Sequence, residues 1–321
     1  MLAIACPGQG SQTPGFLTPW LDLPGVGDHL QSLSDQAGTD LLRHGTVSDE
    51  ETIRDTAVAQ PLIVAASLVT GRLLLQDIVL TAATVVAGHS VGEVTASAIA
   101  GALPEADAVS FVRVRANAMA AAAAVIPTGM SAVLGGDPDD VAGRLADLGL
   151  TAANANGGGQ VVAAGTREQL QALAEDPPIR ARVIALKVAG AFHTGHMAPA
   201  VTALEELLPS LSPTEPIATL ISNYDGKPVA TGGGNLDSLI AQISRPVRWD
   251  LCMESMQAMG VTGILELSPA GTLTGLAKRG MRGTAALAVK SPEDLDTARS
   301  FIEEHLRTTD PDPSLTAEGP Q

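Results

Sequence analysis

The sequence predicts an α/β fold in two parts, a large part built on a parallel sheet and a small ferredoxin-like part inserted in it. Short apolar runs alternate with helical segments in residues 1–126, as in βαβ units. Residues 127–189 then follow the order strand, helix, strand, strand, helix, strand, which is the ferredoxin-like βαββαβ pattern. The α/β pattern resumes in residues 190–307. Residues 308–321 have the composition of a disordered tail.

The elements of the large part follow from apolar runs and their punctuation. We expect its strands at 2–6, 84–88, 217–222 and 261–267, and its helices at 59–76, 91–103 and 104–125. Pro61 stands near the start of the first of these helices, where a missing N–H costs least. A glycine-rich loop, PGQGSQ at 7–12, follows the first strand.

The elements of the small part alternate in a shorter rhythm. Its strands are expected at 128–136, at 150–165 as a pair around a glycine turn, and at 181–189, with helices at 137–149 and 166–176. No internal repeat is present in the sequence. The small part is therefore expected to be an insertion in the larger fold.

Composition excludes several function classes. The formal net charge of −16 argues against nucleic acid or an anionic membrane as the main partner, because both require basic surfaces. Aromatic residues make up only 2% of the chain, which leaves few platforms for stacking single-stranded bases. Cys6 and Cys252 have no metal-ligand spacing, so we expect no metal site and a reducing, cytoplasmic compartment. The sequence contains no run of about eighteen uncharged apolar residues, the length that a membrane-spanning helix requires. We also expect the protein to be a monomer.

Ser90 is the candidate nucleophile. Gly88-His89-Ser90-Val91-Gly92 matches the pattern G-x-S-x-G, in which a sharp strand-to-helix turn, the nucleophile elbow, exposes a serine at the end of a hydrolase-like parallel sheet. By itself the pattern also fits a plain strand–turn–helix junction. The surrounding residues must decide between these interpretations.

A nucleophilic serine needs a base, and two of the six histidines are candidates. His193 and His196 lie in GAFHTGHM, which follows a strand and begins the return from the small part. The alternative is a loop with one structural histidine. An oxyanion also needs donors, and the loop around Gln9 could supply a backbone N–H beside that of Val91. The loop does not match a dinucleotide fingerprint, because Thr13 stands where the third glycine would be.

Six motifs in order carry a family resemblance. PGQGSQ, GHSVGE, VRVRANAM, GAFHTGHM, PVRWDLCM and ELSPAGTLTGLAKR occur over residues 1–305 in the order found in malonyl-CoA:acyl carrier protein transacylases, and the chain resembles a bacterial member. The resemblance implies transfer of malonyl from malonyl-CoA to the phosphopantetheine thiol of an acyl carrier protein, in fatty-acid or polyketide synthesis. It implies a malonyl-serine intermediate and ping-pong kinetics. It implies no metal or redox cofactor, coenzyme A entering only as the thioester substrate.

The resemblance also implies roles for individual residues. Ser90 is expected to be the nucleophile and His193 the base. His193 is chosen over His196 because it has a methionine, Met197, four residues later, as in the family's motif. The backbone carbonyl of Arg248, in the motif PVRW, is expected to orient the histidine. Gln9 and Val91 are expected to supply the N–H groups that bind the oxyanion. In related acyltransferases, residues of the type of Phe192 and Val91 occur with a preference for malonyl over methylmalonyl.

Arg115 is the residue that the resemblance assigns to the substrate carboxylate. A guanidinium suits a carboxylate because it can bind it bidentately and remains charged at any working pH. Helical periodicity alone leaves Arg113 and Arg115 open, since they flank the apolar stripe on opposite sides, and a surface salt bridge fits both.

Two other functions remain open from the residues. The first is a serine hydrolase or thioesterase with the same Ser–His pair, although no acid in residues 91–192 has a clear claim to the third position of its triad. The second is a non-catalytic scaffold that binds carrier proteins, which would not need Ser90 and His193.

A basic cluster is the candidate docking surface for the carrier protein. Carrier proteins of this family's pathways are acidic, and Lys278, Arg279 and Arg282 lie within five residues of one another, with Lys290 on the next apolar segment. The alternative is an ordinary solvated helix end. Arg180, Arg182 and Lys187 in the small part are the next candidates.

Overall fold

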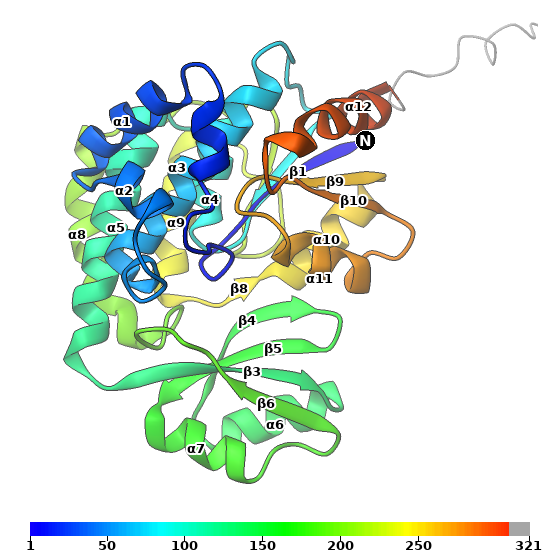
Figure 1. Cartoon of the computed structure of the whole chain (residues 1–321). Helices are drawn as coiled ribbons and strands as arrows, with labels where there is room; N and C mark the ends of the chain where they lie inside the picture. The colour runs from blue at the N-terminus through cyan, green and yellow to red at the C-terminus, as the bar shows by residue number, and fades with distance from the viewer. Residues whose placement is uncertain (308–321) are drawn as a thin grey trace, which may run out of the picture.

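The central element of the large part is a parallel sheet with the strand order β10-β9-β1-β2-β7 (Figure 1). The computed structural model describes residues 1–307, so the tail expected at 308–321 lies outside the described residues. The strands of this sheet are β1 (Leu2–Cys6), β2 (Val85–Gly88), β7 (Thr219–Ile221), β9 (Gly263–Glu266) and β10 (Ala285–Ala288). All four strand pairs are parallel, which requires helical crossovers between the strands.

The second sheet belongs to the small part and has the order β6-β3-β5-β4-β8. Its strands are β3 (Thr128–Gly135), β4 (Thr151–Gly157), β5 (Gln160–Thr166), β6 (Ala181–Ala185) and β8 (Val247–Arg248). The helices α6 (Pro138–Asp147) and α7 (Arg167–Glu175) pack on it with their apolar residues, in the lower half of Figure 1. The first four strands form the predicted ferredoxin-like unit, and the predicted fold class is confirmed.

The strand β8 was not predicted. It comes from the return of the chain through the large part and pairs in parallel with β4, with Asn154 opposite Val247 and Ala155 opposite Arg248. A strand of two residues carries no periodic signal, so it could not be recognised from the pattern of residues. As a result, the small sheet is completed by a segment about sixty residues farther along the chain than its other strands, and Figure 1 shows β8 between the two parts.

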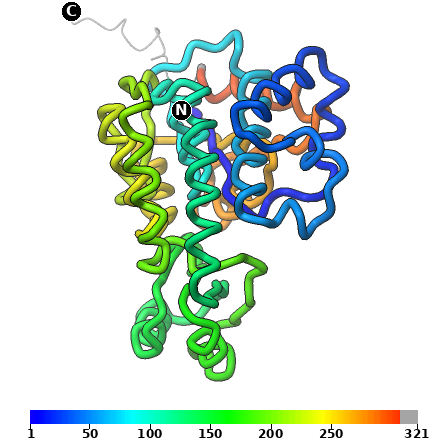
Figure 2. Tube along the Cα trace, turned by 90° about the vertical axis from the view of Figure 1, so that its left-hand side faces the viewer, coloured from blue at the N-terminus to red at the C-terminus, as the bar shows by residue number. Residues whose placement is uncertain are grey.

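Helices cover the parallel sheet, as the turned view in Figure 2 also shows. The helices of the large part are α1 (Val26–Ala37), α2 (Leu41–Thr46), α3 (Thr56–Leu75), α4 (Gly92–Ile99), α5 (Glu105–Val125), α8 (Ala198–Leu207), α9 (Gly232–Ala241), α10 (Trp249–Ala258), α11 (Thr272–Gly280) and α12 (Leu295–Arg307). One apolar cluster joins α1, α3, α4, α5 and α12 to one side of the sheet. A second, rich in methionine, joins α10 and α11 to the other side.

The helix α3 is the most buried of the long helices. It begins at Thr56, three residues earlier than expected, because the Asp55 carboxylate accepts a hydrogen bond from the Ala57 N–H at 2.8 Å and caps it. Pro61 therefore lies inside the helix and not at its start. By length and hydropathy alone, α3 and α5 could each cross a membrane, but 78% of the relevant window of α3 is buried inside the protein. Core helices of globular proteins have the same character.

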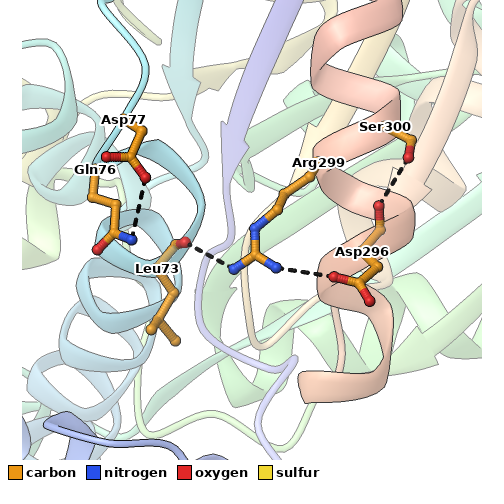
Figure 3. A network of polar contacts seen from close by, with 6 residues as sticks. All are labelled: Leu73, Gln76, Asp77, Asp296, Arg299 and Ser300. Atoms are coloured by element: carbon orange, nitrogen blue, oxygen red, sulfur yellow. Dashed lines mark hydrogen bonds and ion pairs between the residues drawn. The ribbon is translucent and has the colours of Figure 1, made fainter.

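The last helix, α12, packs against β9 and β1. Leu295, Ala298 and Ile302 of α12 are buried in the main core. Figure 3 shows a polar contact at its edge, where the Arg299 guanidinium donates to the Asp296 carboxylate at 3.0 Å and to the Leu73 carbonyl of α3 at 3.5 Å. This contact joins α12 to the end of α3.

Candidate active site

Ser90 lies on a sharp turn between β2 and α4. Its φ of 54° is left-handed, a conformation that side chains other than glycine rarely adopt and that is often kept at functional sites. A Cβ on Gly88 would lie 2.0 Å from the backbone of Gly92, and one on Gly92 would lie 2.1 Å from the Cys6 carbonyl oxygen. Both glycines of the motif are thus required by close backbone contacts. The turn is the predicted nucleophile elbow.

Asn223, which follows β7, holds the elbow from the side. Its Oδ1 accepts a hydrogen bond from the Ser90 N–H at 2.8 Å, and its Nδ2 donates to the Gly88 carbonyl at 2.6 Å. Since its side chain is fully buried, these bonds are not exchanged with water. The strained conformation at Ser90 is therefore supported on both sides of the turn.

His193 is placed against the serine. Its Nε2 lies 2.7 Å from Ser90 Oγ, and its Nδ1 lies 2.8 Å from the backbone carbonyl oxygen of Gln242. A carbonyl can only accept, so Nδ1 carries the hydrogen and Nε2 is free to accept the serine proton. Burial, and next the charge of Arg115, lower the pKa of His193 to about 3. The imidazole is therefore neutral at ordinary pH, as a base must be.

The expectation for Arg248 was wrong. The carbonyl that receives Nδ1–H belongs to Gln242, six residues earlier, at the start of a short 3₁₀ turn (Gln242–Ser244). Arg248 lies in β8, where its N–H donates to the Asn223 carbonyl at 2.9 Å and its side chain pairs with Asp250. The backbone of PVRW is used for pairing with β4, and the motif was the wrong marker for this carbonyl.

His196 is not part of this arrangement. It lies in a short 3₁₀ turn (Gly195–Met197), is partly exposed, and its N–H donates to the Thr194 hydroxyl. His89 lies next to the serine in sequence but points to other partners. Its Nε2 lies 2.9 Å from Asn156 Oδ1 and its ring meets Trp249 edge-on. Of the three histidines, the structure brings only His193 to Ser90 Oγ.

Arg115 points into the site from α5. Its side chain is 1% exposed, whereas Arg113 is exposed to solvent, so the structure separates two residues that periodicity could not. One terminal nitrogen donates to Gln60 Oε1 at 2.6 Å, and the other donates to Gln242 Oε1 at 2.8 Å and approaches Ser90 Oγ at 3.4 Å. Burial lowers its pKa to about 10, which leaves the guanidinium charged at neutral pH.

A cavity of about 90 Å³ adjoins Ser90 and His193. It is lined by Gln9, Gln60, His89, Ser90, Val91, Met119, Met130, Asn154, Val162, Leu186, Val188, Phe192 and His193. Both the N–H of Gln9 and the N–H of Val91 lack an acceptor among residues 1–307, so both are available to a ligand oxygen. Phe192 and Val91, the expected selectivity residues, are part of this lining.

Four polar residues of the site were missed by the sequence analysis: Gln60, Glu93, Asn223 and Gln242. Two of them left a signal. Gln60 is the one amide in the apolar segment of α3, and Glu93 is the one charged residue in α4. A charged or amide side chain in an otherwise apolar helix usually has a buried partner. Asn223 and Gln242 stand in irregular segments, where no periodicity marks them.

The basic residues of the expected docking surface are exposed. Lys278 and Arg279 end α11 and Arg282 follows, while Lys290 lies beyond β10. Arg279 reaches across to the small part, where it donates to Gln160 Oε1 at 3.2 Å. The cluster therefore lies where α11 meets the turn between β4 and β5. Arg180, Arg182 and Lys187 of the small part are also exposed.

The fold and the site together define a serine-dependent acyl transferase architecture, and comparison with known proteins agrees. Residues 5–306 match the family described as "Acyl transferase domain". The chain is 53% identical over 297 residues to the malonyl CoA-acyl carrier protein transacylase of Mycobacterium tuberculosis, which covers 92% of this chain and 98% of that protein. The crystal structure of a protein named MCAT from the same organism superposes with a TM-score of 0.90 at 52% identity, over 93% of this chain and 99% of the other.

A third comparison includes a partner. A malonyl-transacylase solved in complex with its type II polyketide synthase acyl-carrier protein has a TM-score of 0.88 at 29% identity, and covers 93% of this chain and 99% of that chain. The resemblance inferred from the sequence is thus confirmed. The chain belongs to the acyl transferase domain family and, within it, to the malonyl CoA-acyl carrier protein transacylases.

Proposed function

We propose that this protein transfers the malonyl group of malonyl-CoA to the phosphopantetheine thiol of an acyl carrier protein, with Ser90 as the acylated residue. The observation that carries the proposal is the position of Arg115, a buried cation whose terminal nitrogen lies 3.4 Å from the nucleophile oxygen. A neutral acyl group has no use for a buried guanidinium, whereas the carboxylate of malonyl would pair with it. The names of the related proteins support the same activity.

In the first half-reaction His193 accepts the Ser90 proton at Nε2, and Oγ attacks the thioester carbon. The carbonyl oxygen becomes an oxyanion and accepts hydrogen bonds from the N–H groups of Gln9 and Val91, each worth a few kcal/mol in the transition state. When the tetrahedral intermediate collapses, the carbon–sulfur bond breaks and the coenzyme A thiolate takes the proton from His193. The product is a malonyl ester on Ser90.

The second half-reaction runs the same steps in reverse on another thiol. The phosphopantetheine thiol gives its proton to His193 and attacks the ester carbon. The serine oxygen then leaves and recovers the proton from His193. The Gln242 carbonyl holds the imidazole orientation throughout, at 2.8 Å from Nδ1.

A groove next to the cavity offers a path for the pantetheine arm. It shares Gln9, Leu186 and Val188 with the cavity, has a volume of about 300 Å³, and is also lined by the charged residues Glu50, Arg54 and Lys187. A narrow arm carrying an acyl group can reach Ser90 along this groove, while the bulk of coenzyme A or of the carrier remains outside.

We assign the contact with the carrier protein to the exposed basic cluster Lys278, Arg279 and Arg282. We also expect the enzyme to be cytoplasmic and monomeric.

Incubation with isotopically labelled malonyl-CoA tests the proposal directly. Peptide mapping should place the label on Ser90, and adding an acyl carrier protein with its phosphopantetheine arm should transfer the label to the carrier thiol. A thioesterase would instead release labelled malonate to water without a carrier. A scaffold that only binds carrier would take up no label, and either result would reject the proposal.

A further inference from the structure

Gln242 connects the groups that handle the proton with the group that faces the substrate carboxylate. Its backbone oxygen lies 2.8 Å from His193 Nδ1, and its side-chain Oε1 accepts from Arg115 at 2.8 Å. Its side-chain Nε2 donates to the Ser90 carbonyl at 3.0 Å and also to Glu93 Oε2. Every polar atom of this side chain is therefore engaged, and the residue is only 2% exposed.

Glu93 is the anion behind this bridge. It is 4% exposed, and its carboxylate accepts hydrogen bonds from Gln242 Nε2 and, at 2.6 Å, from the Asn223 N–H. None of the proposed chemical steps uses this residue. A buried carboxylate normally has a nearby counter-charge, and among residues 1–307 the cation that acts on Glu93 is Arg115.

The orientation of the Gln242 amide follows from its two neighbours. Arg115 can only donate, so it must face Oε1, and an ionised Glu93 can only accept, so it must face Nε2. The amide dipole therefore lies along the line from anion to cation. Glu93 and Arg115 form an ion pair with one amide between them, and in the free enzyme Glu93 provides the counter-charge of Arg115.

A malonyl group changes this balance. Its carboxylate is a second anion for the same guanidinium, and two anions compete for one buried positive charge. Glu93 can relieve the excess by accepting a proton, and the Ser222 hydroxyl, which can donate or accept, is among the side chains that act on its carboxylate. The substrate carboxylate cannot do so as easily while it is paired directly with the guanidinium.

We propose that Glu93 is a positioning residue that compensates the charge of Arg115 through Gln242, and that binding of the malonyl carboxylate is coupled to uptake of a proton by Glu93. The inference rests on the proposed function, since it assumes an acyl carboxylate at Arg115. It assigns a role in acyl specificity to a residue that touches neither the thioester nor the serine oxygen.

The ionisable surroundings of Glu93 favour this coupling near neutral pH. Burial raises the pKa of Glu93 to about 7, while Arg115 from α5 acts to lower it. The Cys252 thiol of α10 also faces this region, and burial raises its pKa so that it stays neutral. His193, joined through Gln242, is neutral too, because its pKa is lowered to about 3. Among these groups only Glu93 titrates between pH 6 and 8.

The sign of the effect follows from linkage. If malonyl raises the pKa of Glu93, its binding is tightest below the pKa of the free enzyme and weakens as the pH rises through 7, by up to about tenfold per pH unit. An acetyl group carries no charge and should show no such dependence. The ratio of kcat/KM for malonyl-CoA to that for acetyl-CoA removes any titration that both substrates share.

The first test uses the unaltered protein. In weakly buffered solution at pH 7 with a pH indicator, formation of the malonyl-enzyme should take up about half a proton per acylated serine, as expected for a half-ionised group that becomes protonated. Acetyl-CoA should give no uptake. If no malonyl ester forms on Ser90, the proposed function fails. If the ester forms with the same proton balance as the acetyl ester, the inference about Glu93 fails.

The second test uses Glu93→Gln with Glu205→Gln as the control, an exposed glutamate of α8. In the parent and the control, the malonyl-to-acetyl ratio should fall about tenfold or more between pH 6 and 8.5. In Glu93→Gln the ratio should be independent of pH, whatever the absolute rates. A variant with lower activity and an unchanged pH profile would show a merely structural role and overturn the inference.

Discussion

The Arg115 guanidinium lies 3.4 Å from the Ser90 hydroxyl oxygen, from which His193 Nε2 lies 2.7 Å. A serine ester of malonate places its carboxylate one methylene beyond the ester carbon. The same guanidinium is therefore near enough to pair with that carboxylate once the ester has formed. Gln60 accepts from one terminal nitrogen of the guanidinium and Gln242 from the other, so the guanidinium is held in place without a substrate.

Replacing Arg115 by alanine should change specificity as well as rate. The malonyl carboxylate would lose its charged partner in a buried site, a loss on the order of 2 to 4 kcal/mol, whereas acetyl would have no carboxylate to leave unpaired. Arg115→Lys should restore only part of the preference. The measurement is the ratio of kcat/KM for the two thioesters, with the exposed Arg113→Ala as control. A parental ratio in Arg115→Ala would remove the residue from the acyl site.

Ser90→Ala should form no acyl-enzyme. Among the described residues, no other hydroxyl or thiol lies within hydrogen-bond distance of His193 Nε2, so no second nucleophile is placed to replace it. Intact-protein mass spectrometry after incubation with malonyl-CoA measures the adduct. A stable adduct on the variant would disprove the assignment of Ser90.

His193→Ala should slow acylation about 10²- to 10⁴-fold, the usual contribution of a general base. His196→Ala is the matched control, since that histidine lies three residues away and does not reach Ser90. Single-turnover kinetics with malonyl-CoA separate acylation from transfer. If the His196 variant were the slower of the two, the base would be misassigned.

The pH dependence of acetylation, measured in Glu93→Gln so that Glu93 does not titrate, reports on His193, because acetyl carries no carboxylate. A base is active in its neutral form, and the pKa of His193 is lowered to about 3, so its neutral form persists well below pH 6. The acetylation rate constant should change less than about twofold between pH 5 and 8, whereas an unperturbed histidine would lose about 30-fold at pH 5. A titration near pH 6.5 in stopped-flow acetylation would contradict the burial argument.

Reversing two charges at the end of α11 should weaken the carrier half-reaction only. Lys278→Glu with Arg279→Glu should raise the KM for carrier protein several-fold and leave the malonyl-CoA half-reaction unchanged. Added salt should weaken carrier recognition by the parent and affect the variant less, since exposed charges mainly affect encounter. Arg180→Glu with Arg182→Glu is the comparison pair. If that pair has the larger effect, the carrier docks on the small part instead.

The sequence was sufficient where a side chain had a motif of its own. The glycines around Ser90 predicted the elbow. The close backbone contacts at Gly88 and Gly92 show why the motif requires glycine at both positions. The sequence was insufficient where a backbone atom or a buried amide does the work. Any residue has a backbone carbonyl, so the amino-acid sequence could not show whether Gln242 or Arg248 accepts the hydrogen bond from His193 Nδ1.

Helical periodicity could not choose between Arg113 and Arg115 for a different reason. Both flank the apolar stripe of α5, and α5 is covered on more than one side, by α3 and by α8. Helical periodicity identifies one buried face, but it cannot tell which polar residue a second neighbour covers. Gln60 on α3 would have been the deciding clue, since a buried amide in an apolar helix needs a partner.

The parallel pairing of β8 with β4 also determines how this enzyme could be recombined with its relatives. A chimera that exchanged residues 127–189 alone would bring a foreign β4 beside a native β8, and the register of Asn154 with Val247 would have to form between sequences from different parents. Asn154 lines the active-site cavity, so a slip of one residue there would turn its side chain to the other face of the sheet. The unit that can be exchanged intact is therefore discontinuous: it contains the inserted segment together with residues 247–248.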